Sequence, residues 1–535
     1  MSQKSFLKGA AILAIIGVIC KVIGAIFRIP LTNMIGTQGM AYYSTAYPVY
    51  NWLLVISSAG LPVAISKMVS ERVTINDYRG AHLVFKTAFQ VLAYIGVFTT
   101  GALLLLSSYI ADLVGRPNAN IVLLTIAPSL LFVSVLSAYR GYFQGLQMMS
   151  PTAFSQLIEQ LGKLGLGLFF ANLWKDHGVA YGAAGAILGV TLSELLALLF
   201  LVFLYHKHER VIKEPIQANS KAFPQEEKSG ILRQLFILAF PIVLGALAMP
   251  TVQIIDTAIV TNSLLGLGYS QAYADSLFGT LTSVVNPLIN MPAILSLALA
   301  MSLVPAISAS HVKNNLDDIS TKSGMGFKLA LFIGLPCAVG FLLLAKPIIQ
   351  LLYSSLSEQE LQTAGTLLAI MAVGVLFLTV VQTTTGILQG LGKTYLPVIN
   401  LFLGIAIKIV VSLVLIRIPE INVKGAAIGT VACYIVAAIL DVFCVIRYAK
   451  LKFSLGHIFK PIVATAGMGL FVFATHPVLS QIVPAKLATL IVVAFAVILY
   501  VVLSFAIGVF TKDDMSFFPG GSKIALIMVR LRIWR

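Results

Sequence analysis

Long apolar runs fill most of the chain, separated by short polar breaks. Fourteen runs are long enough to cross a bilayer core of about 30 Å as helices, which takes about 20 apolar residues each. They cover residues 8–30, 42–66, 84–110, 119–144, 152–174, 180–205, 232–259, 277–307, 325–352, 362–388, 395–417, 425–447, 458–480 and 485–510. The runs are continuous rather than alternating, which disfavours β-spans. The pattern therefore predicts an all-α integral membrane protein with 14 transmembrane helices.

Positive charges between the runs predict which side of the membrane each connection faces. With a cytoplasmic N-terminus, 26 of the 36 Lys and Arg residues fall in inner segments and only six in outer loops. Those six are Arg116, Lys175, Lys346, Arg417, Lys424 and Lys486. We therefore expect both termini to be cytoplasmic, in a multi-pass protein of the cytoplasmic membrane.

Composition agrees with a lipid environment. Hydrophobic residues make up 59% of the chain and charged residues 10%, against about 25% charged residues in soluble domains. We expect the net charge of +16 to face anionic lipids of the inner leaflet, so it does not call for a nucleic-acid partner. The first run carries internal charges and lacks a cleavage site, so it is predicted to remain as a helix.

One hydrophilic stretch, residues 206–231, is predicted to be a cytoplasmic linker between two lobes. The N-terminal lobe would comprise residues 1–205 and the C-terminal lobe residues 232–447. Residues 448–510 would add two helices, and residues 511–535 a basic cytoplasmic tail. That tail, which includes "SKIALIMVRLRIWR", is either amphipathic and membrane-bound or disordered.

The two lobes carry a weak internal repeat. The segment "YRGYFQGLQ" at 139–147 parallels "TTGILQGLG" at 384–392, an offset of 245, and Lys163 aligns with Lys408 at the same offset. Both copies end a helix predicted to run from outside to inside. The lobes are therefore predicted to be parallel, pseudo-symmetric bundles of six helices with a substrate path between them.

The first run carries two cations within its apolar pattern. Gly17, Lys21, Gly24 and Arg28 recur at steps of four, three and four, which places them on one helical face. A charge at the bilayer centre costs about 2.5–3.5 kcal/mol, so such residues line a protein interior or a wet cavity. Residues 1–70 contain no acid, and arginine suits two phosphate oxygens. We therefore predict an anion site; alternatively, Arg28 snorkels to the outer interface.

Other ionisable residues also fall inside the runs. Glu159 and Lys163 are four residues apart on one helix, which predicts a mutually neutralising pair that Glu194 could join. Asp256 and Lys408 fall in different predicted helices. Their contact would be an electrostatic lock or a proton-linked pair.

Polar and aromatic residues near the ends of runs are further candidates. The cluster Tyr42, Tyr43, Tyr47 and Tyr50 predicts an aromatic belt at the membrane interface, or alternatively sugar stacking at the mouth of a cavity. Asp441, near the inner end of its run, is expected at the interface.

Asn286 and Asn290, next to Pro287 and Pro292, predict a kinked helix that lines a cavity. The chain has no Walker A, HExxH or GxSxG motif. We therefore expect a protein that is not an enzyme and that needs neither a cofactor nor a metal.

Motif order gives a resemblance to a known family. The segments "KVIGAIFRIPLTNMIG", "SSAGLPVAISKMVSER" and "YRGYFQGLQMMSPTAFSQLIEQ", together with the span count, resemble the polysaccharide-transport branch of the MOP (multidrug/oligosaccharidyl-lipid/polysaccharide) exporter superfamily. SpoVB/YtgP-type proteins of Gram-positive bacteria, relatives of the MurJ lipid II flippases, are most similar. The resemblance implies export of an undecaprenyl-pyrophosphate-linked saccharide by alternating access, with Arg28, and less strongly Lys21, at the pyrophosphate.

Two departures from the family pattern concern acids. The segment "GTQGMAYYSTAY" lacks the acid that commonly follows the first helix of MurJ-like proteins. Where sodium-binding members have an acid on helix seven, Asp256 matches, but Lys408 and Ser412 stand where Asn and Asp are expected on helix eleven. The resemblance therefore leaves membrane potential, H+ and Na+ all open as the driving force.

The sequence favours a flippase for a lipid-linked cell-wall precursor, with lipid II as the first candidate and a teichoic-acid or other polysaccharide intermediate as the alternative. Lys21, Arg28, Tyr43, Asn286 and Asn290 are the predicted substrate contacts. A cation-coupled drug antiporter of the same superfamily is a rival, although it would need acids in the N-terminal cavity. A second rival is a non-transporting scaffold for cell-wall synthesis proteins.

Overall fold

The computed structural model describes residues 3–207, 227–450 and 455–510, and within these ranges the chain is helical and contains no β-strand. This confirms the all-α membrane class for the described part of the chain. Most of the predicted linker and the whole of the predicted basic tail lie outside the described residues.

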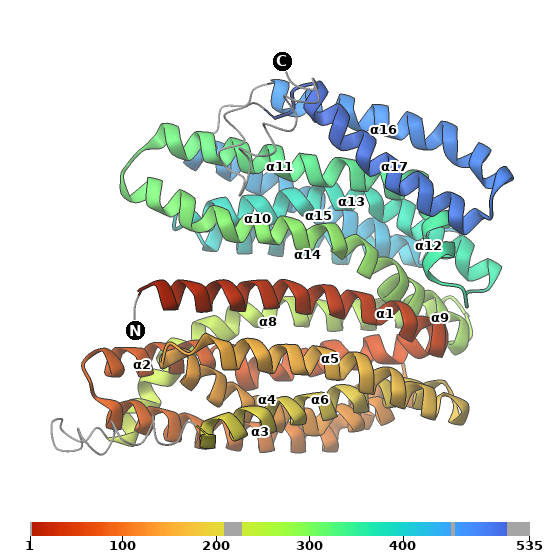
Figure 1. Ribbon diagram of the computed structural model, residues 1–535. Helices are drawn as coiled ribbons and strands as arrows, with labels where there is room; N and C mark the ends of the chain where they lie inside the picture. The colour runs from red at the N-terminus through yellow and green to blue at the C-terminus, as the bar shows by residue number, and fades with distance from the viewer. Residues whose placement is uncertain (1–2, 208–226, 451–454, 511–535) are drawn as a thin grey trace. The chain divides into compact units, whose positions relative to one another are not determined.

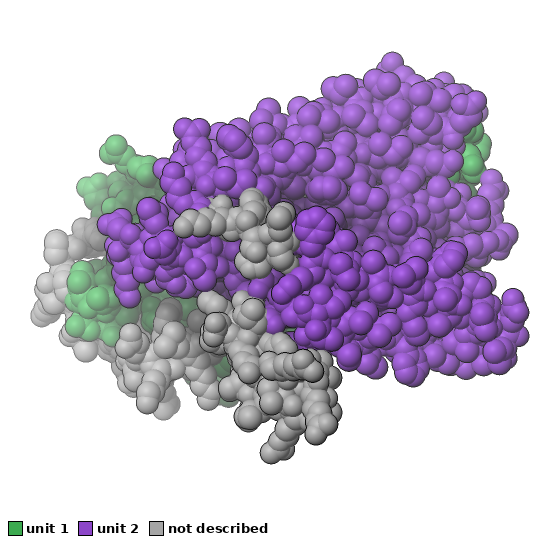
Figure 2. All heavy atoms as spheres, turned by 90° about the horizontal axis from the view of Figure 1, so that it is seen from above, with its two compact units in different colours: residues 1–265, 269–279 green, residues 266–268, 280–535 purple. Residues whose placement is uncertain are grey.

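The chain folds into two compact units, which Figure 2 colours separately. Unit 1 comprises residues 1–265 and 269–279, and unit 2 comprises residues 266–268 and 280–535. This division differs from the predicted lobes, because the helix after the linker groups with unit 1. Within unit 1, Trp52 Nε1 donates a hydrogen bond to Thr251 Oγ1 at 3.1 Å, and this contact ties that helix to the N-terminal one.

Unit 1 is a helical bundle (Figure 1). In chain order it contains α1 (Gln3–Leu54), the π-helix η1 (Val55–Ala59), α2 (Leu61–Thr74), α3 (Tyr78–Leu113), η2 (Pro117–Ala119), α4 (Asn120–Gly145), α5 (Met149–Trp174), η3 (Lys175–His177), α6 (Val179–Lys207), α8 (Lys228–Gly266) and α9 (Gln271–Gly279). Helix α5 packs along α6 and α1, and α4 packs along α3 and α6.

Unit 2 is a second bundle (Figure 1). It contains the π-helix η4 (Thr280–Val285), α10 (Asn286–Val312), α11 (Leu316–Leu343), α12 (Ala345–Leu352), α13 (Glu358–Gly390), α14 (Tyr395–Ile416), α15 (Lys424–Ala449), α16 (Leu455–Ile482) and α17 (Ala485–Ala506). The central helix α13 packs against α10, α11 and α15, and α16 pairs with α17 beside α11.

Helix α1 combines the first predicted run with the start of the second. A straight helix of 52 residues would be about 78 Å long, more than twice the bilayer core. Gly36 interrupts it with φ 68° and ψ 178°, a conformation that glycine adopts without the steric cost of a side chain. The break separates the cation-bearing half, which holds Lys21 and Arg28, from the tyrosine-bearing half.

Eleven helices among the described residues are long and apolar enough to cross a membrane. One of them, Ile15–Thr74, covers two predicted runs. The runs at 152–174 and 232–259 are helical, as α5 and α8, but they are not among the eleven. The count of fourteen spans, the pseudo-symmetry and the cytoplasmic termini therefore stay predictions.

The helix of the ninth predicted run begins earlier in the chain than the hydropathy pattern indicates. We expected it at 325–352, but α11 spans Leu316–Leu343 and a break at Leu344 separates it from α12. Asn315 caps the start of α11, accepting a hydrogen bond from Asp318 N at 3.1 Å. Hydropathy missed this polar first turn because a capping turn need not be apolar.

Helices α5 and α6 approach each other closely at glycines. A Cβ on Gly189 of α6 would lie 2.2 Å from the backbone nitrogen of Gly167 on α5. That separation is far below van der Waals contact. A Cβ and a backbone nitrogen both have positions set by the main chain, so no side-chain rotation can relieve the clash. The missing side chain is therefore what allows this close packing.

We predict that Gly189→Ala destabilises unit 1 by about 1–3 kcal/mol, the usual cost of overpacking. The measurement is the apparent melting temperature of purified protein in detergent. Gly165→Ala is the matched control, because a Cβ on Gly165 of α5 would meet no atom within 4 Å. Equal melting temperatures for the two variants would contradict the close contact.

Candidate functional site in unit 1

Arg28 of α1 and Lys163 of α5 carry like charges in the same region of unit 1. Arg28 is half-buried, and Lys163 is only 9% exposed. Arg28 interacts electrostatically with both Lys163 and Tyr43. Like charges that interact in a poorly solvated region repel each other, so this interaction is consistent with the predicted anion site, which stays a prediction.

Lys163 is surrounded by aromatic groups. Its Nζ donates a hydrogen bond to the Tyr47 hydroxyl at 2.9 Å, and it lies 4.6 Å from the centroid of the Tyr47 ring and 5.5 Å from that of Phe27. Ring faces and a hydroxyl stabilise an ammonium group without cancelling its charge. Lys163 therefore adds positive charge to the predicted anion site, a role that its sequence position did not reveal.

Glu159, predicted to pair with Lys163 on its own helix, forms a salt bridge with a residue of another helix. Arg140 Nη2 of α4 donates to Glu159 Oε2 at 2.9 Å, and Arg140 Nε donates to Ser155 Oγ at 2.9 Å. Ser155 and Glu159 are one turn apart on α5, so the planar guanidinium reaches both. A lysine on the same helix offers only a weak pairing in comparison.

Glu194 of α6 brings a buried acid against α1. It is 2% exposed, and its Oε1 accepts a hydrogen bond from the Tyr50 hydroxyl at 2.5 Å. Glu159 and Lys163 also act on it electrostatically. The absence of acids from residues 1–70 therefore did not mean an acid-free surrounding for α1.

The tyrosines of α1 do not form an interfacial belt, which corrects that prediction. Tyr43 and Tyr50 are 1% and 3% exposed. Ring centroids lie 5.4 Å apart for the stacked pair Tyr43–Tyr47 and 5.8 Å apart for Tyr47–Tyr50. Their spacing along α1 puts them on the face that packs inside unit 1. The substrate contact assigned to Tyr43 stays a prediction.

Lys21 lies on the exposed part of the same cationic face of α1. Among the described residues it makes no ion pair. A Cβ on Gly24 would lie 3.5 Å from Gln160 Oε1 of α5, whereas one on Gly17 would meet nothing within 4 Å. The face therefore packs on α5 toward Arg28 and opens toward Lys21.

The remaining predicted residues lie elsewhere. Asp256 is half-buried in α8 of unit 1, and Lys408 is half-buried in α14 of unit 2. Their predicted pairing stays a prediction. In unit 2, Asn286 begins α10 directly after the π-helix η4, and Asn290 is exposed one turn later. The irregular backbone expected near the prolines is present.

Asp441 of α15 is not interfacial, which corrects another prediction. It is 1% exposed, and it accepts hydrogen bonds from Asn400 Nδ2 at 2.8 Å and from Thr384 Oγ1 at 3.2 Å. These donors come from α14 and α13. Neutral donors from neighbouring helices satisfy the carboxyl group deep inside unit 2.

Arg116, predicted to be an outer-loop cation, is fully buried. Its Nε lies 2.6 Å from Asp275 Oδ1 of α9, and its Nη1 donates to Thr45 Oγ1 at 3.0 Å. Phe278 covers the guanidinium, with the ring centroid 4.1 Å from Cζ. Burial lowers the pKa of Arg116, and the negative charge of Asp275 opposes this shift. Through its contacts with Asp275 and Thr45, Arg116 fixes the α3–α4 connection to α9 and α1.

We predict that Arg116→Met destabilises unit 1 by about 3–5 kcal/mol, because it leaves Asp275 buried without its cation. The double variant Arg116→Met/Asp275→Leu should recover most of the loss, since no buried charge remains. Melting temperatures of the two variants and the wild type test this. A double variant less stable than Arg116→Met would contradict the assignment.

Comparison with known proteins supplies the family. Residues 6–311, more than half of the chain, match the family model described as Polysaccharide biosynthesis protein. The chain belongs to this family. Residues 279–414 also match the MatE model. The resemblance to the MOP superfamily is thereby confirmed.

Three relatives are informative. The chain is 27% identical over 534 residues to the uncharacterised membrane protein YabM of Bacillus subtilis. This match covers 98% of this chain and 96% of YabM. It is 28% identical to the lipid II flippase MurJ of the same organism, over 85% of each chain. A solved MurJ structure in an inward closed conformation superposes with TM-score 0.67 and 15% identity, over 93% of this chain and 98% of that one.

These matches establish the general class. The chain is a multi-pass membrane transporter of the MOP superfamily, related to MurJ, and its relatives are transporters and flippases rather than enzymes. Because the solved structures share less than 25% identity with it, they support the fold alone.

Proposed function

We propose that this chain is a flippase that moves an undecaprenyl-pyrophosphate-linked saccharide across the cytoplasmic membrane by alternating access, with lipid II as the first candidate. The observation that supports it most is the electrostatic interaction between the buried Lys163 and Arg28. Hydroxyl and ring contacts leave the charge of Lys163 in place, while Glu159 is engaged by Arg140.

A pyrophosphate matches this arrangement chemically. Its negative oxygens would relieve the repulsion between Arg28 and Lys163, and the guanidinium of Arg28 can hold two oxygens at once. Lys21 lies seven residues earlier on α1, a rise of about 10 Å. It would attract the same group before it reaches Arg28. Tyr43, Asn286 and Asn290 are the proposed contacts of the saccharide.

The relatives support the same substrate class. MurJ of Bacillus subtilis bears the name lipid II flippase and is similar over 85% of both chains. By this comparison the chain would act in the cytoplasmic membrane of a Gram-positive bacterium, next to anionic lipids and cell-wall synthesis proteins. Membrane potential, H+ or Na+ would drive it, and Asp256 and Lys408 are the proposed coupling residues.

We predict that Lys163→Met and Arg28→Gln each lower lipid II translocation at least tenfold, because each removes positive charge from the proposed pyrophosphate site. The measurement is outer-leaflet lipid II in cells depleted of their own flippase, detected with an added lipid II-degrading enzyme and scaled to the amount of protein in the membrane. Lys163→Arg should retain most of the activity.

Lys67→Met is the matched control. Lys67 is exposed on α2, where it forms an ion pair with exposed Glu71 at 3.9 Å. Wild-type translocation by both Lys163→Met and Arg28→Gln would refute the assigned roles. If the wild-type chain does not restore translocation of lipid II, another lipid-linked polysaccharide or a teichoic-acid precursor becomes the proposed substrate.

A cation-coupled drug antiporter is the second candidate, favoured by two observations. Glu194 places a buried carboxyl against Tyr50 of α1, which removes the main argument against this rival, and residues 279–414 match the MatE model. An antiporter predicts efflux of a cationic dye such as ethidium, lost at least tenfold in Glu194→Gln. A flippase predicts no efflux by either protein, measured in the same membrane vesicles.

A further inference from the structure

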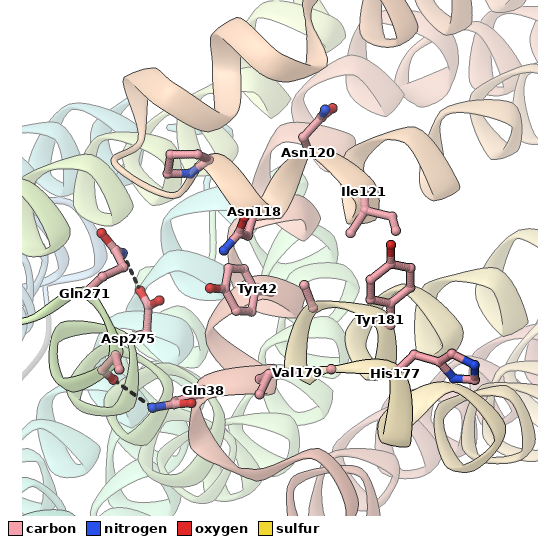
Figure 3. Close-up of a pocket in the computed structure, with 14 residues that line it drawn as sticks. Gln38, Tyr42, Asn118, Asn120, Ile121, His177, Val179, Tyr181, Gln271 and Asp275 are labelled. Carbon is pink, nitrogen blue, oxygen red and sulfur yellow. Dashed lines mark hydrogen bonds between the residues drawn. The ribbon is translucent and has the colours of Figure 1, made fainter.

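A polar pocket of about 650 Å³ lies within unit 1, apart from the Arg28–Lys163 region (Figure 3). The pocket lies where the start of α4, the α5–α6 turn and helix α9 come together. The charge pattern predicts that this end of unit 1 faces outside. The polar side chains that line the pocket are Gln38, Tyr42, Asn118, Asn120, His177, Tyr181, Gln271 and Asp275.

No Lys or Arg lines this pocket, and its acid is already engaged. Asp275 is 1% exposed; it pairs with buried Arg116 and accepts a hydrogen bond from Gln271 Nε2 at 3.0 Å. The ion pair therefore balances the only formal negative charge in the wall. A phosphate finds no cation to meet it, and a metal ion finds a carboxylate that is already neutralised.

Hydrogen-bonding capacity remains in the wall. Asn120 Oδ1 is buried and has no hydrogen-bond partner in the described part of the chain, a state that costs about 1–3 kcal/mol until a ligand or water supplies a donor. Asn118, which hydrogen-bonds with Tyr42, and Gln271, which donates to Asp275, add the remaining donor and acceptor positions of their amides. Amide groups both donate and accept, so they match groups that do the same, such as hydroxyls and N-acetyl amides.

Aromatic and apolar surface completes the pocket. Tyr181 is 46% exposed, and in Figure 3 it faces the side chain of Ile121 across from Asn118 and Tyr42. Ring faces cover the C–H surface of a sugar, while their hydroxyl ends stay available to hydrogen-bond. The volume falls within the range of about 300–1,000 Å³ that is typical of small-molecule sites.

From these observations we infer that the pocket binds an uncharged, N-acetylated saccharide. Asn118 and Asn120 contact its hydroxyl and amide groups, and Tyr181 packs on its ring. The inference goes beyond the proposed function, because such a pocket binds a glycan whether or not the chain moves lipid II. Its ligand is either the head group of a lipid-linked saccharide or a free glycan at the same face.

The test titrates the purified full chain with di-N-acetylchitobiose, an uncharged dimer of N-acetylglucosamine, by saturation-transfer NMR. Asn118→Leu and Tyr181→Ala should each weaken binding at least tenfold. Asn172→Leu and Tyr109→Ala are matched controls: both residues are exposed in unit 1 and neither lines the pocket. Each variant is compared only if its melting temperature matches that of the wild type.

A second arm distinguishes the two sources of the ligand. A soluble, short-chain lipid pyrophosphate carrying the same disaccharide competes with the free disaccharide for the pocket. If the head group is the natural ligand, the lipid pyrophosphate should displace the free disaccharide at a lower concentration than unlabelled free disaccharide does. Displacement at equal concentrations indicates a free glycan. Lys163→Met should lose translocation and keep disaccharide binding, which separates this site from the proposed anion site. Failure of the wild type to bind the disaccharide, or equal binding by pocket and control variants, would overturn the inference.

Discussion

A charge inside an apolar helix is stable only where another part of the protein replaces water around it. Unit 1 meets this requirement with partners from neighbouring helices. Arg140 of α4 holds Glu159 of α5, and Tyr50 of α1 donates to Glu194 of α6. These contacts make the charged residues part of the packing between helices, so the bundle and its polar interior depend on each other.

Lys163 differs from these residues in a way that matters for function. Its contacts lower the cost of burying an ammonium group, but none of them cancels the charge. Arg28 acts on Lys163 electrostatically, which is the basis of the proposed anion site. Glu159, on the same helix as Lys163, pairs with Arg140 of α4 rather than with Lys163 in the salt bridge that it forms.

Two buried acids, Asp441 and Asp275, are stabilised in different ways. Unit 2 surrounds Asp441 with neutral donors, Asn400 and Thr384, whereas unit 1 binds Asp275 with a fully buried arginine. The second solution also anchors a connection: Arg116 joins the α3–α4 loop to α9 and leaves the pocket beside it without net charge. A single ion pair thus shapes both the stability of that end and the ligands it accepts.

Hydropathy and the spacing of charges were enough to predict the all-helical membrane class, most helix positions and the cationic face of α1. These are local properties: the length of an apolar run depends on the bilayer, and a step of four, three and four residues defines one face of one helix. The family resemblance rested on motif order, which is also linear information.

Tertiary structure decided which charges meet. Glu159 pairs with Arg140, nineteen residues away along the chain, rather than with Lys163 on its own helix. The guanidinium of Arg140 comes from a neighbouring helix and reaches both Ser155 and Glu159 of α5. Tyr43 and Asp441 are buried, although their sequence positions suggested the membrane interface. Arg116, predicted to lie in an exposed loop, is buried against Asp275, 159 residues later in the chain. Contacts between distant segments depend on how helices pack, and a pattern read along one helix contains no information about the face of another.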